Sequence, residues 1–346
     1  MNAQNELQEI VQALVQKGKG ILAADESVPT IAKRFQAIGV ASTHENRRAW
    51  RSLMLAAPGL GEFISGVILH EETLGQCTDD GTPLPQLATR QGIVSGIKVD
   101  AGKIPLAGAP GDEITQGMDG LAKRLDAYKE QGVRFAKWRA VYNVSDMLPS
   151  QLAIETNAQA LAHFAAICQE CGIVPIVEPE VLIDGDHTLA RCAEVTEAVL
   201  HEVFHALHRH RVALEHMLLK PSMVLPGKAQ AQRAGPDEVA AQTLRILRRT
   251  VPAAVPSVNF LSGGQTPEEA TANLDAMNRL GPQPWQLSFS YGRALQEPAL
   301  LVWMGHATNE CNSQNALLER VRLNSAACQA QYCAAMEAAA PVSRLA

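Results

Sequence analysis

A lysine interrupts a short apolar stretch near the middle of the chain. Lys220 follows Leu218 and Leu219, and the apolar residues Met223 and Val224 come soon after it. A lysine is rarely buried without a partner, and burial favours its uncharged form. A neutral amine can attack a ketone carbon and form a Schiff base. Taken alone, the stretch also fits a strand-end lysine whose ammonium reaches solvent, so the rest of the chain must decide.

Polar residues stand at the ends of seven apolar runs. In chain order they are Asp25-Glu26-Ser27, Lys98 with Asp100, Lys137 with Arg139, Glu178 with Glu180, Lys220, Ser262-Gly263-Gly264, and Ser290-Tyr291-Gly292-Arg293. Because strand side chains alternate between two faces, Lys137 and Arg139 share a face, and so do Glu178 and Glu180. For one pair, a solvated strand end is the simpler interpretation. Seven such ends favour one shared site.

The charges in this set predict an anionic substrate. Five cations would converge in a protein whose formal net charge is -6, and they are Lys98, Lys137, Arg139, Lys220 and Arg293. A focused positive mouth attracts an anion. Gly263 and Gly264 expose backbone N–H groups, which suits a phosphate after the seventh strand of a barrel. A plain turn is the alternative there, and the flanking Arg293 favours phosphate.

These residue types can together break a carbon–carbon bond. An iminium formed by Lys220 is an electron sink for an adjacent bond. Forming and hydrolysing that iminium needs a general acid/base, and Glu178 lies one strand away from the lysine. Asp25 is the candidate to take the proton from the hydroxyl beside the broken bond. None of these steps requires a metal.

The elements that must position these residues alternate between strands and helices. The expected strands are Ile21–Asp25, Phe63–His70, Ile93–Asp100, Phe135–Tyr142, Ile173–Val181, Met217–Val224, Val258–Gly263 and Gln286–Tyr291. Helical patterns separate them at Glu45–Ala57, Leu121–Gln131, Asn157–Cys171, His187–Arg211 and Pro236–Thr250, and Thr266-Pro267-Glu268-Glu269 has the pattern of a capping box. Eight strand–helix units predict an α/β fold, a (β/α)8 TIM barrel. A doubly wound open sheet is the alternative.

Length and composition fit one such domain over residues 1–346. An amphipathic helix is expected at about 1–17, and the alanine-rich end, about 334–346, is expected to be a mobile tail. The net charge of -6 gives no case for nucleic acid or an anionic membrane as partner. We see no secretory signal and no membrane-spanning run. Seven cysteines, an odd number, then predict free thiols in a reducing cytoplasm.

Several long motifs resemble one known family. They are Gly18-Lys19-Gly20-Ile21-Leu22-Ala23-Ala24-Asp25-Glu26-Ser27, Gly96-Ile97-Lys98-Val99-Asp100, Phe135-Ala136-Lys137-Trp138-Arg139, Ile173-Val174-Pro175-Ile176-Val177-Glu178-Pro179-Glu180, Leu218-Leu219-Lys220-Pro221, Phe260-Leu261-Ser262-Gly263-Gly264-Gln265 and Phe289-Ser290-Tyr291-Gly292-Arg293-Ala294-Leu295. In this order they resemble the class I fructose-bisphosphate aldolases. The resemblance runs from about Gly18 into the last helix.

The resemblance implies a TIM barrel, usually a homotetramer, that reversibly splits fructose 1,6-bisphosphate into dihydroxyacetone phosphate and glyceraldehyde 3-phosphate. It implies that Lys220 forms the Schiff base and Glu178 moves its protons, that Asp25 and Lys137 serve the cleaved bond, and that Glu180 orders the lysines. The residues implied for substrate binding are Ser262, Gly263 and Arg293 at the ketone-side phosphate, Ser27, Arg34 and Lys98 toward the other phosphate, and Arg139 in support, and Ser290 and Gly292 are further substrate- or phosphate-binding residues.

Two features depart from the family pattern. Val28-Pro29-Thr30 stands where Thr-Gly-Ser is expected after Ser27, although Thr30 keeps a hydroxyl. The chain ends Val342-Ser343-Arg344-Leu345-Ala346, whereas eukaryotic relatives end in a tyrosine that assists proton exchange, and the nearest aromatic here is Tyr332. A preference for another ketose phosphate, such as fructose 1-phosphate, is therefore the alternative substrate prediction.

The sequence has three competing interpretations. His201-Glu202-Val203-Phe204-His205 matches the H-E-x-x-H pattern of zinc proteases, but a crossover helix with a buried Val203 and Phe204 favours a histidine-rich surface. Cys168 and Cys171 form a C-x-x-C pair at a helix end, where two packed thiols are expected rather than a redox pair. A scaffold without activity is the non-enzyme alternative, and the filled catalytic positions argue against it.

Overall fold

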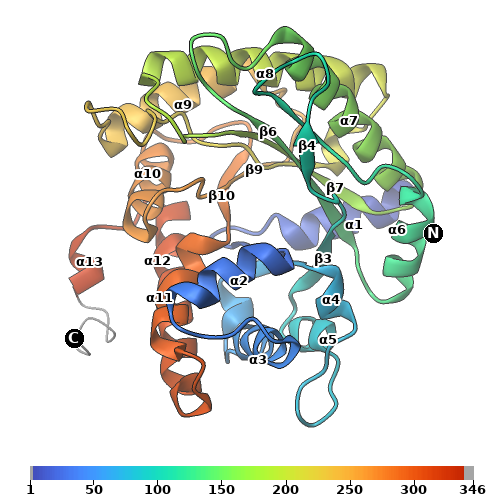
Figure 1. Cartoon of the computed structure of the whole chain (residues 1–346), viewed down its shortest axis with the longest axis vertical. Helices are drawn as coiled ribbons and strands as arrows, with labels where there is room; N and C mark the ends of the chain where they lie inside the picture. The colour runs from blue at the N-terminus through green and yellow to red at the C-terminus, as the bar shows by residue number, and fades with distance from the viewer. Residues whose placement is uncertain (1–2, 339–346) are drawn as a thin grey trace.

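The computed structural model describes residues 3–338, and its centre is a closed barrel of eight parallel strands (Figure 1). Around the barrel the strands are β1 (Gly20–Ala24), β2 (Ile64–Leu69), β3 (Val94–Lys98), β6 (Phe135–Tyr142), β7 (Val174–Val181), β8 (Leu218–Leu219), β9 (Ser257–Phe260) and β10 (Gln286–Tyr291). The ring closes where β1 pairs with β10, with Ile21 opposite Ser290. The predicted TIM barrel is confirmed, and an open doubly wound sheet is excluded.

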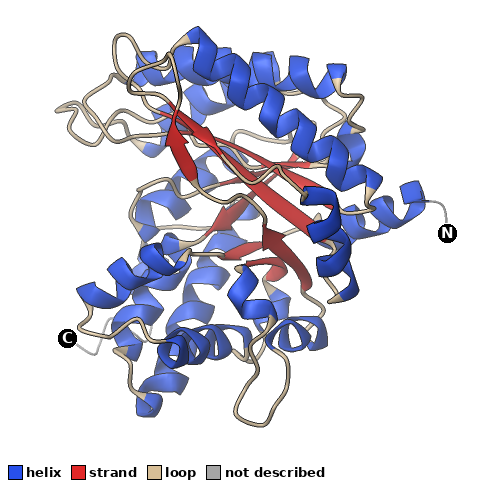
Figure 2. Cartoon of the chain, turned by 45° about the vertical axis from the view of Figure 1, so that its right-hand side comes forward, coloured by secondary structure: helices blue, strands red, loops and turns tan. Residues whose placement is uncertain are grey.

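Helices follow the strands and surround them on the outside (Figure 2). They are α1 (Ala3–Leu14), α2 (Val28–Ala37), α3 (His44–Leu55), α4 (Glu71–Leu74), α5 (Leu84–Arg90), α6 (Leu121–Glu130), α7 (Gln151–Glu170), α8 (Leu189–Arg209), α9 (Pro236–Thr250), α10 (Pro267–Arg279), α11 (Arg293–Trp303), α12 (Glu310–Cys328) and α13 (Ala335–Ala338). The predicted capping box is present at α10, where Thr266 and Glu269 bond to each other's backbone N–H. None of these helices is long and apolar enough to cross a membrane.

The strands divide their side chains between two apolar layers. One layer packs the strands against the outer helices. The other fills the barrel interior, where Ile21, Ile68, Phe135 and Ile176 meet the apolar face of α1. Since α1 packs on these inward residues, it covers the amino-terminal end of the barrel. Side chains two residues further along each strand have the same inward orientation and lie toward the opposite, carboxyl end.

The structure differs from the expected elements at several places. β8 ends at Leu219, one residue before Lys220, because Pro221 lacks an N–H with which to extend the ladder. α7 begins at Gln151, where the Ser150 hydroxyl caps it, and not near Asn157. The segment after β3 contains a hairpin that was not expected, formed by β4 (Lys103–Pro105) and β5 (Glu113–Thr115).

The expected mobile tail is only partly within the described residues. Ala335–Ala338 form the short helix α13, in which Glu337 pairs with the buried Arg320 at 2.6 Å. The hydroxyl of Tyr332 also donates to Glu337, at 2.9 Å. This beginning of the tail therefore contacts α12, and the mobility of the tail stays a prediction. Residues 339–346 lie outside the described residues.

Candidate active site

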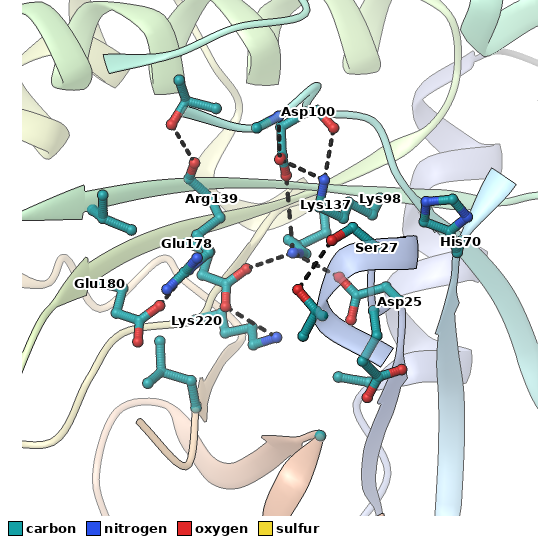
Figure 3. Close-up of a pocket in the computed structure, with 18 of the residues that line it drawn as sticks. Asp25, Ser27, His70, Lys98, Asp100, Lys137, Arg139, Glu178, Glu180 and Lys220 are labelled. Atoms are coloured by element: carbon teal, nitrogen blue, oxygen red, sulfur yellow. Dashed lines mark hydrogen bonds and ion pairs between the residues drawn. The ribbon is translucent and has the colours of Figure 1, made fainter. Parts of the chain in front are cut away.

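A cavity of about 820 Å³ opens at the carboxyl ends of the barrel strands. All fourteen residues predicted from the sequence line it, namely Asp25, Ser27, Arg34, Lys98, Lys137, Arg139, Glu178, Glu180, Lys220, Ser262, Gly263, Ser290, Gly292 and Arg293. They come from seven of the eight strand ends, so the fold brings together groups that are more than 250 residues apart in the chain. Figure 3 shows the charged residues of this cavity turned toward one another.

Lys137 lies at the centre of the charged cluster. Its Nζ is 2.7 Å from Oδ2 of Asp25, 3.0 Å from Oε2 of Glu178 and 3.9 Å from Oδ2 of Asp100 (Figure 3). Asp25 and Asp100 follow β1 and β3, whereas Lys137 and Glu178 lie within β6 and β7. Only 3% of Lys137 is exposed, so the three carboxylates take the place of water around its ammonium.

The cluster fixes the charge of its members. Burial alone would raise the pKa of Asp25, but the positive charges of Lys137 and Lys220 outweigh burial and hold that pKa well below its usual range. Burial likewise would lower the pKa of Lys137, and the charges of Asp25, Glu178 and Asp100 raise it above its usual range instead. At neutral pH, Asp25 is therefore a carboxylate and Lys137 an ammonium.

Lys220 has a different environment from Lys137. Its Nζ lies 3.2 Å from Oε1 of Glu178, the one carboxylate that pairs with it among the described residues. Leu218 points into the apolar barrel interior on the same face, and only 3% of Lys220 is exposed. Lys220 is thus enclosed by apolar groups below and by the cavity above, and its single carboxylate is shared with Lys137.

Arg139 and Glu180 form a second pair at the wall of the cavity. Nε of Arg139 donates a hydrogen bond to Oε2 of Glu180, on the neighbouring strand β7. The carbonyl of Arg139 accepts a hydrogen bond of 2.7 Å from the hydroxyl of Thr115, which ties the unexpected hairpin to the site. Among the described contacts, Glu180 meets Arg139 and not a lysine.

Backbone and side-chain donors for a phosphate gather after β9 and β10. Gly263 has φ +51° and Gly264 has φ +88°, conformations that favour glycine and turn the backbone toward the cavity. The hydroxyl of Ser290 is buried and has no hydrogen-bond partner in residues 3–338. Nη2 of Arg293 donates to the carbonyl of Gln265 at 3.2 Å, which holds the guanidinium beside these groups.

The residues assigned to the other phosphate come from the segment after β1, from α2 and from the end of β3. The hydroxyl of Ser27 lies 3.0 Å from that of Thr30. The segment Val28-Pro29-Thr30, which differs from the family pattern, therefore keeps a hydroxyl that pairs with Ser27. Nη1 of Arg34 donates to Glu26. Nζ of Lys98 lies 2.7 Å from the carbonyl and 2.6 Å from Oδ1 of Asp100. Both cations on this side therefore have a carboxylate partner.

Sequence reasoning assigned no role to three further lining residues. Asp100 and Glu26 are part of the strand-end motifs. Asp100 is opposite in charge to Lys98, and Glu26 to Arg34, so their charges could have predicted these ion pairs. His70 follows β2, and it ends the one expected strand to which no polar group was assigned. Because His70 is the last residue of that expected strand, its position could have predicted a place in the site.

The competing motifs lie away from this cavity. His201 and Glu202 belong to α8, and 57% of the His201 side chain is exposed. In the part of the chain that the structure describes, no group of three or more His, Cys, Asp or Glu could hold a metal ion. Cys168 is fully buried, burial raises the pKa of its thiol, and both Cys168 and Cys171 are free. Two packed thiols were predicted, and the structure agrees.

Fold and site together define a (β/α)8-barrel enzyme with a buried lysine at the carboxyl ends of its strands. Comparison with known proteins narrows this class. A model of class-I fructose-bisphosphate aldolase matches residues 6–345. The chain therefore belongs to the class-I fructose-bisphosphate aldolase family. As a member it is a carbon–carbon lyase that cleaves fructose 1,6-bisphosphate.

Individual relatives are similar in sequence to almost the whole chain. A probable fructose-bisphosphate aldolase class 1 of Xanthomonas campestris is 52% identical over 93% of this chain and 97% of its own. Fructose-bisphosphate aldolase B of Gallus gallus is also 52% identical, over 94% and 90% of the two chains. A crystal structure of the Plasmodium falciparum aldolase, in complex with TRAP and a small-molecule inhibitor, superposes with a TM-score of 0.95 at 48% identity and 96% coverage of both chains.

Proposed function

We propose that the reaction proceeds through a Schiff base on Lys220. The observation that carries this proposal is the contact of 3.2 Å between the buried Nζ of Lys220 and Oε1 of Glu178. The amine attacks the ketone carbon of fructose 1,6-bisphosphate and forms a carbinolamine. Glu178 donates a proton to the departing hydroxyl, which leaves as water, and the nitrogen becomes an iminium.

Asp25 then begins the cleavage. Because Lys137 holds it as a carboxylate, it can take the proton from the hydroxyl on the carbon that becomes the aldehyde, which is one end of the bond that breaks. The electron pair of the broken bond moves to the iminium, which becomes an enamine, and glyceraldehyde 3-phosphate departs. Protonation of the enamine carbon and hydrolysis of the iminium release dihydroxyacetone phosphate and restore Lys220.

The other lining residues hold the two phosphates. Ser262, Gly263, Ser290, Gly292 and Arg293 bind the ketone-side phosphate in this proposal, because their donors adjoin Lys220 in the cavity. Ser27, Arg34 and Lys98 lie toward the phosphate of the aldehyde half, and Arg139 with Glu180 supports the wall between them. Fructose 1-phosphate remains the alternative substrate, since it requires only the first of these two sites.

The proposal extends to cofactors, partners, oligomeric state and location in the cell. It needs no metal, because the iminium is the electron sink. The partner is a small sugar phosphate rather than nucleic acid or membrane, in keeping with the family. We further propose that the chain forms one barrel domain, assembles as a homotetramer and works in the cytoplasm.

Reductive trapping tests the covalent step. Borohydride added together with dihydroxyacetone phosphate should reduce the iminium to a stable secondary amine and inactivate the protein, whereas either reagent alone should not. Peptide mapping should place the added mass on Lys220. Lys220→Arg should give no adduct, because a guanidinium stays protonated. Lys103→Arg, the same change at a rim lysine paired with Glu113, should still be trapped on Lys220. Turnover without any adduct, or an adduct on Lys137, would overturn the assignment.

A further inference from the structure

The end of β2 holds a polar side chain that has no role in the reaction described so far. In the barrel, β2 pairs with β1 on one side and with β3 on the other. The residues proposed for the aldehyde-side phosphate, Ser27 and Lys98, follow β1 and end β3. His70 directly follows β2 and lines the same cavity between them. Figure 3 shows it on the same side of the cavity as Lys98, Ser27 and Asp25.

The direction of the His70 side chain follows from the strand. Ile68 points into the barrel interior, where it packs in the cluster covered by α1. Since side chains alternate, His70 has the same inward orientation two residues later. At the level of His70, the barrel interior is polar and opens into the cavity of the site. His70 is half-buried there, with one edge of the ring available to a ligand.

One nitrogen of the ring is already occupied. Nδ1 accepts a hydrogen bond of 3.2 Å from the backbone N–H of Glu72 and so caps α4. Glu72 is itself held by Arg47 and Arg51, so this donor is fixed in place. An Nδ1 that accepts has no proton, and the neutral ring must then hold its proton on Nε2. Burial, together with the charges of Arg51 and Lys98, lowers the pKa of His70 and keeps it neutral near pH 7.

This leaves an unused donor beside two cations that already have carboxylate partners. Nε2 of His70 has no hydrogen-bond partner in residues 3–338. Lys98 has three donor hydrogens, and Asp100 accepts from it through both its carbonyl and its carboxylate. Arg34 is paired with Glu26. These ion pairs offset part of the positive charge of Lys98 and Arg34, so a further donor would strengthen the hold on a phosphate dianion on this side. Capping alone would not require a histidine, because asparagine, aspartate and serine cap helices well.

We propose that His70 is a specificity-determining residue, whose Nε2–H donates a hydrogen bond to the phosphate on the aldehyde half of the substrate. The proposal rests on the proposed function, since it assigns one contact within that site. It predicts that His70 favours fructose 1,6-bisphosphate over fructose 1-phosphate, because only the bisphosphate has a group for it to bind. The contact is to a part of the substrate that does not react, so KM should respond more than kcat.

Two substitutions separate the two nitrogens of the ring. His70→Asn keeps a cap acceptor close to the position of Nδ1 and removes the donor at Nε2. His70→Gln places an amide N–H near the position of Nε2. With both substrates assayed, His70→Asn should lower kcat/KM for fructose 1,6-bisphosphate about tenfold, the loss typical of one charge-assisted hydrogen bond. Activity on fructose 1-phosphate should stay within about twofold, and His70→Gln should keep most of the preference.

Controls distinguish this contact from a structural role. Thr43→Asn makes the same kind of change at the cap of α3, where Thr43 accepts from the N–H of Asn46, and should leave the substrate ratio unchanged. If His70→Asn does not fold, His70→Gln and His70→Met make the same comparison, since only glutamine of these two retains a donor. An equal loss on both substrates, or an unchanged ratio in the variants without a donor, would overturn the proposal for His70.

The wild-type protein separates this proposal from the one on which it depends. If it cleaves neither substrate, or forms no borohydride adduct on Lys220, the Schiff-base function fails and the His70 contact fails with it. If it is active and trapped on Lys220 but His70→Asn keeps the wild-type ratio, only the His70 contact is wrong.

Discussion

Lys220 and Glu178 meet across neighbouring strands, with Nζ of the lysine 3.2 Å from Oε1 of the glutamate. The second oxygen of the same carboxylate lies 3.0 Å from Nζ of Lys137. One buried carboxylate therefore bridges two lysines, of which the second also holds Asp25. A change at any member of this set should therefore disturb the contacts of the others.

Glu178→Gln should separate binding from chemistry. The amide fills the same volume and can still contact both lysines, but it cannot shuttle a proton. We expect kcat to fall by about 10² to 10⁴, the usual worth of a general acid/base, with substrate still bound. Rapid-quench measurements should show slow formation or slow release of the covalent species. A variant that keeps the wild-type kcat would contradict the role given to Glu178.

Arg293→Ala should weaken the hold on the ketone-side phosphate. A guanidinium can bind phosphate through two parallel hydrogen bonds, and a lysine cannot. We expect KM for fructose 1,6-bisphosphate to rise at least about tenfold, with partial recovery in Arg293→Lys. Steady-state kinetics on the three proteins test this. If KM in the alanine variant stays within about twofold of wild type, the phosphate lies elsewhere.

Removal of metal should leave cleavage intact. In the proposed reaction the iminium on Lys220 accepts the electrons of the broken bond, so no Lewis acid is needed. We expect activity to survive extended dialysis against EDTA, measured with metal-free buffers. A loss that zinc restores, and magnesium does not, would replace the Schiff-base mechanism with a metal-dependent one.

Glu72 should contribute stability that depends on pH. Hydrogen bonds from Arg47 and Arg51 lower its pKa from 4.5 to about 2. A lowered pKa in the folded state means that the contribution is complete above pH 4.5 and is lost as the pH falls toward 2. Glu72→Gln should lower the free energy of unfolding by about 2 kcal/mol at pH 7, less than for a fully buried pair because 19% of its side chain is exposed.

Urea unfolding at several pH values measures this contribution. The difference between wild type and Glu72→Gln should be constant from pH 7 to about 5 and should narrow below pH 4.5. Glu45→Gln, the matched change at an exposed partner of Arg48, should cost much less at every pH. A difference for Glu72 that widens on acidification would mean that its carboxylate does not stabilise the fold.

The sequence could predict the barrel and its reacting groups because both depend on local patterns. Runs such as Phe135–Tyr142 and Gln286–Tyr291 have the bounds that were expected. Once the runs are parallel strands of one barrel, their ends must meet, so Lys220, Glu178 and Asp25 could be placed together without coordinates. The types of these residues then limited the chemistry.

Partner choice within the cluster could not be predicted in the same way. Glu180 pairs with Arg139 and not with a lysine, and this pair is diagonal, since the register of β6 and β7 places Arg139 opposite Glu178 and Glu180 opposite Val141. His70 was missed for a related reason. A histidine at a strand end predicts only a solvated end of the strand. It indicates a substrate contact once the neighbouring strands, β1 and β3, are known to carry residues of the same half of the site.

The closing of the barrel by β1 and β10 sets an order for biosynthesis. Asp25 leaves the ribosome among the first residues, whereas β10 and Arg293 are made after most of the chain. A nascent chain that ends before β10 already contains Lys220 and Glu178, but its first strand has no partner on one edge and no Arg293 to hold a phosphate. The ribosome must therefore complete β10 before the barrel can close. It must also add Arg293 before the site can bind both phosphates of the substrate.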